Sequence, residues 1–356
     1  MTTAQLHLRS AKLLMMLPVA LVGCTGTPGV VFDQTEAASA WPPPPDQPRL
    51  RYVGQIKTAG DLKPGLGVGE SIGEFLFGKE EALGMVSPMG VCTNGGDEVY
   101  IADSAAQLVH VFNLKNRKYQ RWTPKPPLPA FAQPVAIAYD TAGRRVLVSD
   151  PAAGVIFAFN QRGECTGTLG DGILRRPCGV AVHPTTGVIA VADVDAHQIV
   201  FLASTGADHA RLGSRGTDPG RFNFPTYVAY DGAGRLYVSD SLNFRVQAFA
   251  PDHAFLRSIG TKGDMPGYFS QPKGLAVDAE DHLYVVDANF EAVQVFSTEG
   301  QLLMTFGREG KGPGEFWLPA GIATDPSGRV WVADSYNRRV QVFQYLGAGW
   351  GLGGTP

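Results

Sequence analysis

Three polar side chains recur at a fixed spacing in this chain: an Asp, an Asn three residues later and an Arg two residues after that. They are Asp240, Asn243 and Arg245 in DSLNFRVQAF, and Asp334, Asn337 and Arg339 in DSYNRRVQVF. A carboxylate, an amide and a guanidinium together could bind a charged or polar ligand. They could equally fix a turn, with the Asp accepting backbone N–H groups and the Arg pairing with it. Because the set repeats, we predict that it is mainly structural.

The phrase belongs to a longer repeat that covers most of the chain. Six strand-like segments end in an Asp, at intervals of 47, 43, 47, 47 and 47 residues: Asp103, Asp150, Asp193, Asp240, Asp287 and Asp334. A proline opens a second apolar segment in the same register each time: Pro88, Pro134, Pro177, Pro225, Pro272 and Pro319. Four short strands per repeat without any helical pattern predict an all-β fold, a six-bladed β-propeller of four-stranded antiparallel blades.

The two ends of the repeat region predict how the ring closes. The sixth repeat has no convincing fourth strand after VQVF, whereas RLRYVGQI from Arg49 is a strand pattern without a repeat of its own. Pairing this N-terminal strand into the last blade would remove the free sheet edges. We therefore predict one propeller over residues 49–346, followed by a Gly-rich tail over 347–356.

The first 48 residues look like an export signal and a spacer. Arg9 and Lys12 precede an apolar run that is too short to span a bilayer as a helix. The run ends in Leu-Val-Gly before Cys24, which resembles the lipobox of bacterial lipoproteins. This resemblance implies a signal peptide over 1–23, a lipid on Cys24 and, since Thr25 is not Asp, the outer membrane of a Gram-negative cell. The alternative is an ordinary secretory signal. Residues 24–48, with four consecutive prolines, are predicted to be a Pro-rich spacer.

The repeat phrases PxGIAxDxxGxVxVADSxNxRVQVF and GPGEFxxP resemble the NHL-repeat family, in particular its exported six-bladed bacterial propellers. The resemblance covers about 300 residues and is strongest in the last three repeats. It implies the propeller fold. The function is then expected to reside in residues that differ between blades, on the face where the loops converge.

The variable residue after each proline is expected to line the mouth of the central channel: Met89, Val135, Cys178, Thr226, Lys273 and Ala320. Together with the turns that follow the repeated Asp, this gives a candidate binding face: Lys273, Thr226, Asn243, Arg245, Tyr336, Asn337, Arg338 and Arg339. We predict a lipid-anchored, monomeric scaffold of the cell envelope that binds a protein partner through this face.

Other functions have less support in the sequence. Some six-bladed propellers are metal-dependent lactonases or lyases, which would need Ca or Zn in the channel and at least three ligands for it. The histidines fall at scattered positions, so no metal, cofactor or catalytic residue is predicted. A net charge of −3 without a basic tract disfavours nucleic acid. Sugar binding in the channel remains a third possibility. No disulfide is expected between Cys165 and Cys178.

Overall fold

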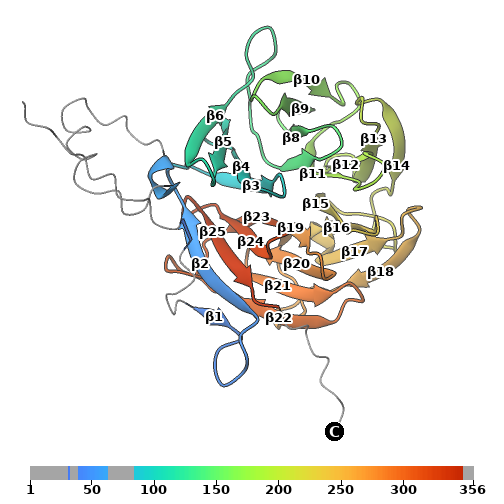
Figure 1. Cartoon of the computed structure of the whole chain (residues 1–356). Helices are drawn as coiled ribbons and strands as arrows, with labels where there is room; N and C mark the ends of the chain where they lie inside the picture. Colours follow the sequence, from blue (N-terminus) through green and yellow to red (C-terminus); the bar gives the residue numbers. More distant parts are fainter. Residues whose placement is uncertain (1–30, 33–38, 63–83, 348–356) are drawn as a thin grey trace, which may run out of the picture.

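The computed structural model describes residues 31–32, 39–62 and 84–347 (Figure 1). The predicted signal peptide, Cys24 and the last nine residues lie outside this part of the chain. Within it, six antiparallel sheets form the blades of a propeller, numbered 1 to 6 in chain order. The innermost strands of neighbouring blades contact one another around the whole ring.

The first three blades each use four consecutive strands. Blade 1 contains β3 (Pro88–Thr93), β4 (Glu98–Asp103), β5 (Leu108–Asn113) and β6 (Lys118–Trp122). Blade 2 contains β7 (Ile137–Asp140), β8 (Arg145–Asp150), β9 (Val155–Asn160) and β10 (Cys165–Leu169). Blade 3 contains β11 (Pro177–Val182), β12 (Ile189–Asp193), β13 (Gln198–Leu202) and β14 (Asp208–Leu212).

The next two blades repeat this order, and the last draws on both ends of the chain. Blade 4 contains β15 (Pro225–Tyr230), β16 (Leu236–Asp240), β17 (Arg245–Phe249) and β18 (Phe255–Ile259). Blade 5 contains β19 (Pro272–Val277), β20 (His282–Asp287), β21 (Ala292–Ser297) and β22 (Leu302–Phe306). Blade 6 contains β23 (Pro319–Thr324), β24 (Arg329–Asp334), β25 (Arg339–Tyr345) and the N-terminal strand β2 (Leu50–Ile56).

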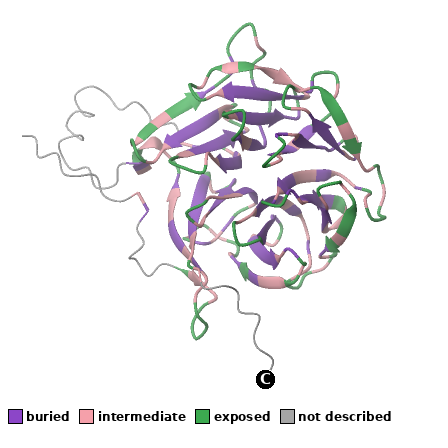
Figure 2. Ribbon diagram, turned by 45° about the vertical axis from the view of Figure 1, so that its right-hand side comes forward, coloured by how far each residue is buried: buried purple, intermediate pink, exposed green. Residues whose placement is uncertain are grey.

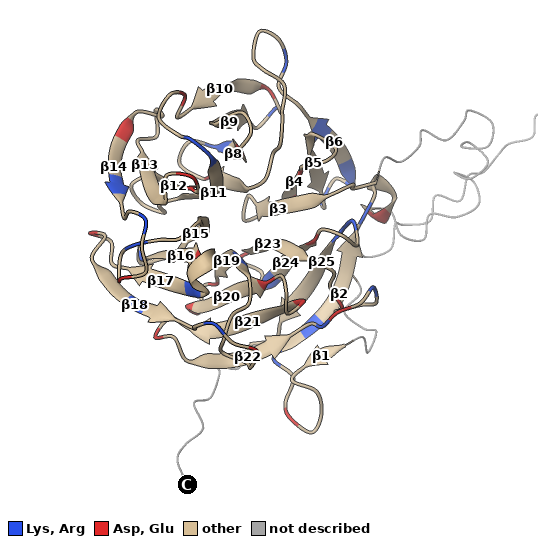
Figure 3. Ribbon diagram, turned by 180° about the vertical axis from the view of Figure 1, so that it is seen from behind, with Lys and Arg blue, Asp and Glu red and all other residues tan. Residues whose placement is uncertain are grey.

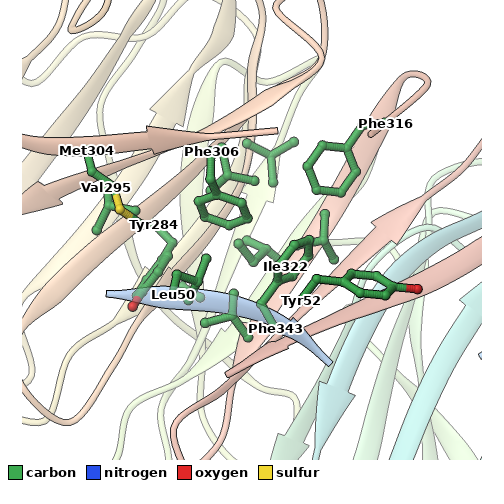
Figure 4. Close-up of a cluster of buried hydrophobic side chains, with 14 residues drawn as sticks. Leu50, Tyr52, Tyr284, Val295, Met304, Phe306, Phe316, Ile322 and Phe343 are labelled. Carbon is green, nitrogen blue, oxygen red and sulfur yellow. The ribbon is translucent and has the colours of Figure 1, made fainter. Parts of the chain in front are cut away.

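Strand β2 closes the ring as the sequence predicts. It pairs antiparallel with β25, with Tyr52 opposite Phe343, and the two aromatic rings lie 5.8 Å apart. Leu50 and Tyr52 join an apolar cluster with side chains of blades 5 and 6, among them Phe316 (Figure 4). Burial of this apolar surface fixes the N-terminal strand on the last blade.

Part of the predicted spacer also belongs to the fold. Strand β1 (Ala40–Trp41) pairs with β2 as a fifth strand of blade 6. Trp41 packs against Phe343 at 5.7 Å, and the buried Phe32 contacts Trp331 edge-on at 5.5 Å. The sequence missed these contacts because isolated aromatic residues among prolines carry no strand periodicity.

The core lies between the blades (Figure 2). The described residues contain six clusters of buried apolar side chains, such as the one shared by blades 4 and 5 around Phe269. Phe222, Phe269 and Phe316, three residues before the inner-strand prolines, are fully buried. Large side chains thus fill the wedges between twisted sheets.

The inner strands approach each other too closely for most side chains. A Cβ atom on Gly321 of blade 6 would lie 2.5 Å from the carbonyl oxygen of Met89 in blade 1. Glycine is therefore required at position 321, where the inner strands of blades 6 and 1 meet.

Helical structure in the described residues is limited to two short 3₁₀ turns, η1 (Ala59–Leu62) and η2 (Ser241–Asn243). None of the helices found there could cross a membrane.

Candidate functional site

The six repeated Asp residues end the second strand of each blade and lie on one face of the ring. We call this the loop face: it consists of the turns that follow these Asp residues and the loops that precede the inner strands. Each of the six carboxylates is almost completely buried and accepts N–H groups from the loop before the inner strand. A buried carboxylate that ties a loop to a strand end is a structural element.

The Asn and Arg of the repeated phrase complete this element in blades 4 and 6. Asn243 donates to Asp240 at 2.8 Å, and the Nε of Arg245 donates to the same carboxylate at 2.9 Å. The other end of Arg245 donates to the carbonyl oxygens of Asp218 and Arg221 at 3.0 Å. The guanidinium thus connects the Asp to the preceding Gly-Pro-rich loop.

Blade 6 repeats the arrangement with deeper burial. Arg339 donates to Asp334 at 2.6 Å, and it also reaches the carbonyl oxygens of Lys311, Gly312 and Glu315. Its fifth partner is the Gln55 side chain of the closing strand β2 at 3.0 Å. Four residues of the predicted binding face therefore donate hydrogen bonds to other groups of the protein itself: Asn243, Arg245, Asn337 and Arg339.

Blade 1 substitutes a histidine within this element. His110 is buried; its Nε2 lies 3.1 Å from Asp103 and its Nδ1 lies 2.7 Å from the Tyr119 hydroxyl. Burial would raise the pKa of Asp103, but hydrogen bonds from His110 and from backbone N–H groups outweigh it and hold that pKa below its usual value. Asp103 and His110 are buried, whereas Tyr119 on the outer strand β6 is half-buried.

Thr226 and Lys273 lie nearer the axis, at the start of their inner strands. The Thr226 hydroxyl contacts the Ser241 hydroxyl at 2.6 Å, and Ser241 donates to the carbonyl oxygen of Pro272 in the next blade. Burial lowers the pKa of Lys273, against the opposing effect of the Glu291 and Asp287 carboxylates. Both residues are half-buried rather than displayed to a partner.

A tyrosine crosses the channel near this mouth. Tyr227 of blade 4 occupies the position that is glycine in four other blades, and its hydroxyl donates to the carbonyl oxygen of Met89 in blade 1, on the opposite side of the ring, at 3.3 Å. Cys178 lies close to Tyr227, and burial raises the pKa of its thiol to about 11. This tyrosine links opposite blades near the channel mouth that the residues after the prolines were expected to line.

An axial cavity of about 330 Å³ lies between the inner strands, toward the face opposite the loop face. Aliphatic residues of all six inner strands line it, and its polar members are Tyr139, Tyr230, Asp231 and Thr324. Among the described residues, no three His, Cys, Asp or Glu side chains come together to hold a metal ion. Cys92, Cys165 and Cys178 are free thiols.

The loop face instead displays apolar side chains. Trp317 and Tyr336 of blade 6 contact each other with ring centroids 5.6 Å apart, and they are 39% and 60% exposed. The ammonium of Lys311 lies 4.9 Å from the Trp317 ring, and Arg338 beside them is exposed. The exposed Val86, Leu242 and Met265 lie in other loops of the same face.

Of the predicted binding face, Tyr336 and Arg338 are thus the two exposed members. Sequence reasoning did not select Trp317, although it stands directly after the buried Phe316, in a position that varies from blade to blade. Charged residues of both signs are interspersed along the strands and loops (Figure 3).

Comparisons with known proteins agree with this architecture. The model of the NHL repeat matches residues 316–343, which include strands β23 and β24 and most of β25 of blade 6. A search of curated proteins finds no match to this sequence.

Solved structures with the same fold share little sequence with this chain. An auxiliary nutrient binding protein from Bacteroides thetaiotaomicron matches with a TM-score of 0.58 and 10% identity, over 73% of this chain and 69% of that one. A gluconolactonase from Xanthomonas campestris matches with a TM-score of 0.56 and 17% identity, over 73% and 86%. Virginiamycin B lyase from Staphylococcus aureus matches with a TM-score of 0.51 and 16% identity, over 73% and 95%. The chain is therefore a six-bladed β-propeller that carries an NHL repeat in its sixth blade.

Proposed function

We propose that this propeller is a scaffold of the bacterial cell envelope that binds a protein partner through its loop face. The observation that carries the proposal is the distribution of exposed apolar residues. Five of the eight large apolar side chains that are exposed in the described part of the chain lie in loops of this face: Val86, Leu242, Met265, Trp317 and Tyr336. Exposed apolar groups that gather on one face mark interaction surfaces.

The centre of the proposed interface is the Trp317–Tyr336 pair with Lys311 and Arg338 around it. Aromatic residues and Arg dominate the energetics of protein interfaces. Since this pair lies among cations, the complementary partner surface would combine an apolar contact with carboxylates. The opposite face has an aliphatic cavity instead.

A lipid on Cys24, in the outer membrane, is the second half of the proposal. The observation that supports it is the sequence Leu-Val-Gly-Cys at the end of the apolar run. Exchange of Cys24 for Ala should move the protein from the membrane fraction to the soluble fraction. A variant that stays membrane-bound would contradict the anchor but would leave the loop-face proposal standing.

A photo-crosslinking amino acid placed at Tyr336 tests the loop face in intact membranes. We expect one dominant crosslinked partner at this position. The matched control is Leu256 on the outer strand β18, which is 41% exposed but lies away from the loop face. Equal crosslinking at both positions, or none at Tyr336, would refute the proposed interface.

Alanine substitution measures the strength of the same contact. Trp317→Ala should weaken partner binding by about 30-fold or more, because aromatic anchors at interface centres contribute about 2 kcal/mol or more. Leu256→Ala should leave the binding constant unchanged.

The alternative function is a metal-dependent hydrolase or lyase, the class to which the gluconolactonase among the structural neighbours points. Such an enzyme needs three or more ligands around its metal, and no three His, Cys, Asp or Glu side chains of the described residues come together in this way. Stoichiometric Ca or Zn in the purified protein would favour this alternative over the scaffold.

A further inference from the structure

Blade 3 lacks the side chains that fill the repeated element in blades 4 and 6. In blade 4, Asn243, Arg245 and Gln247 all donate to Oδ2 of Asp240, at 2.8, 2.9 and 3.1 Å. Blade 6 has the same three donors, Asn337, Arg339 and Gln341, on Asp334. The positions that correspond in blade 3 are Ala196, Gln198 and Val200. The strand register gives this correspondence, because Gln198 lies opposite Asp193 on the neighbouring strand as Arg245 lies opposite Asp240.

The loop that covers this element is also shorter in blade 3. Between the outer strand β10 and the inner strand β11 it has seven residues, 170–176, against twelve in blade 4, 213–224. The longer loop supplies the carbonyl oxygens of Asp218 and Arg221 that bind Arg245. Compared with blade 4, blade 3 therefore has neither the internal guanidinium nor the long loop that encloses it.

A pocket of about 410 Å³ lies beside Asp193, where blades 4 and 6 have their Asn, Arg and Gln side chains. It is lined by Asp193, by Ala196, Gln198 and Val200, by the short loop from Gly172 to Arg175 and by Arg211. The Asp193 side chain is 1% exposed. It accepts the backbone N–H groups of Arg175 and Arg176, each at 2.9 Å, and no side chain within the described residues donates a hydrogen bond to it.

Two backbone donors leave lone pairs of this carboxylate unused, since a carboxylate accepts about four hydrogen bonds. A buried anion in this condition is stabilised by a cation that can reach it. Two nearby arginines have other carboxylates: Arg211 pairs with Asp208 at 2.7 Å and Arg176 with Asp195 at 3.5 Å. The side chain of Arg175, which also lines the pocket, is exposed, and it is the backbone N–H of this residue that donates to Asp193.

We propose that this pocket binds the guanidinium group of an arginine side chain presented by the protein partner. The chain itself shows the fit, because the same place in blades 4 and 6 holds a guanidinium on the same carboxylate. A planar fork can meet a carboxylate and a second acceptor together, which a compact ammonium cannot do as well. The Nε2 of Gln198 donates to the carbonyl oxygen of Gly213 at 3.1 Å, so its amide oxygen is available as a further acceptor.

The pocket lies on the loop face, in the blade opposite Trp317 and Tyr336. The identity of the arginine donor rests on the proposed function, whereas the affinity of the pocket for guanidinium does not. A small arginine compound can therefore test the pocket without the partner.

The experiment is an NMR titration of the full chain, in detergent micelles, with Nα-acetyl-argininamide. The amide resonances of Arg175 and Arg176, whose N–H groups donate to Asp193, should shift saturably with a dissociation constant on the order of millimolar. The neutral analogue Nα-acetyl-citrullinamide should bind at least about tenfold more weakly, because it lacks the charge-assisted bond.

Two variants make the assignment specific. Gln198→Arg supplies an internal guanidinium, as in blades 4 and 6, and should weaken binding of the arginine compound at least tenfold. Arg245→Gln opens the equivalent place in blade 4, so the amide of Asn223, which donates to Asp240, should begin to respond to the compound.

Three results would overturn the proposal. The first is the same response to the citrulline and arginine compounds, and the second is an undiminished response in Gln198→Arg. The third combines two observations: the amide of Asn223 shifts with the arginine compound in the Arg245→Gln variant, but the amides of Arg175 and Arg176 do not shift in the native protein. This result would mean that a side chain of the protein itself already fills the blade 3 pocket. Failure here leaves the crosslinking test at Tyr336 unaffected, and failure of that test leaves the pocket unaffected.

Discussion

Replacement of Arg339 by Gln is the most direct test of how the ring is held closed. The guanidinium is 3% exposed and links five partners: the Asp334 carboxylate, the carbonyl oxygens of Lys311, Gly312 and Glu315, and the Gln55 side chain. Gln55 belongs to the N-terminal strand, so one side chain ties the closing strand, the last blade and its loop together. Glutamine is too short to span these groups.

The expected cost follows from what the change leaves behind. Removal of one member of a buried ion pair costs about 3–5 kcal/mol, because the remaining charge is buried and unpaired. Asp334 would still accept hydrogen bonds from Asn337 and Gln341, which places the expected loss of stability at the lower end, about 3 kcal/mol. Arg245→Gln is the matched control in blade 4. Arg245 is 13% exposed and has no contact with the closing strand, so water can replace part of its bonds, and the expected loss is about 1–2 kcal/mol.

Urea unfolding of the two variants and the native protein, followed by tryptophan fluorescence, measures both differences. The slope of the unfolding free energy against urea should stay constant, so that shifts in midpoint report stability. An Arg339→Gln midpoint within error of the native value would refute the role of Arg339 in closure. So would a larger loss in Arg245→Gln than in Arg339→Gln.

Two further predictions concern the inner strands and the response to acid. Gly321→Ala should destabilise the fold by about 1–3 kcal/mol, because its Cβ would lie 2.5 Å from the carbonyl oxygen of Met89. The control is Gly232→Ala, whose Cβ would meet nothing within 4 Å. Equal thermal unfolding of the two variants would contradict the close approach of blades 6 and 1. The lowered pKa of Asp103 contributes stability that is present above its unfolded pKa of about 3.9 and is lost as the pH falls through its folded pKa. Asp103→Asn should therefore unfold less steeply with acid, by up to about 1.4 kcal/mol per pH unit for the one proton; an unchanged acid slope would show that Asp103 takes no part.

The sequence alone predicts the architecture well, for a physical reason. Each blade ends its second strand at a buried carboxylate, and these Asp residues recur every 43 or 47 positions. A proline opens the inner strand in five blades and stands three residues before it in blade 2, and these prolines recur every 43 to 48 positions. Strand β2 could be assigned to blade 6 because a propeller without it would leave an unpaired edge. Strand β1 and Phe32 could not be foreseen, since they are held by single aromatic contacts to Phe343 and Trp331 rather than by a pattern of their own.

The candidate sites, in contrast to the architecture, depend mainly on the tertiary structure. The sequence shows that the phrase with Asp334, Asn337 and Arg339 repeats, and it favours a structural role for these residues. Only the tertiary structure shows that Arg339 reaches a strand 284 residues away in the sequence, and that Trp317 stands beside Tyr336 in solvent. The pocket of blade 3 likewise depends on three substitutions and a shorter loop that meet at one carboxylate. Repetition along the chain records what every blade needs locally, whereas exposed patches and pockets arise from the packing of distant segments, which no local pattern encodes.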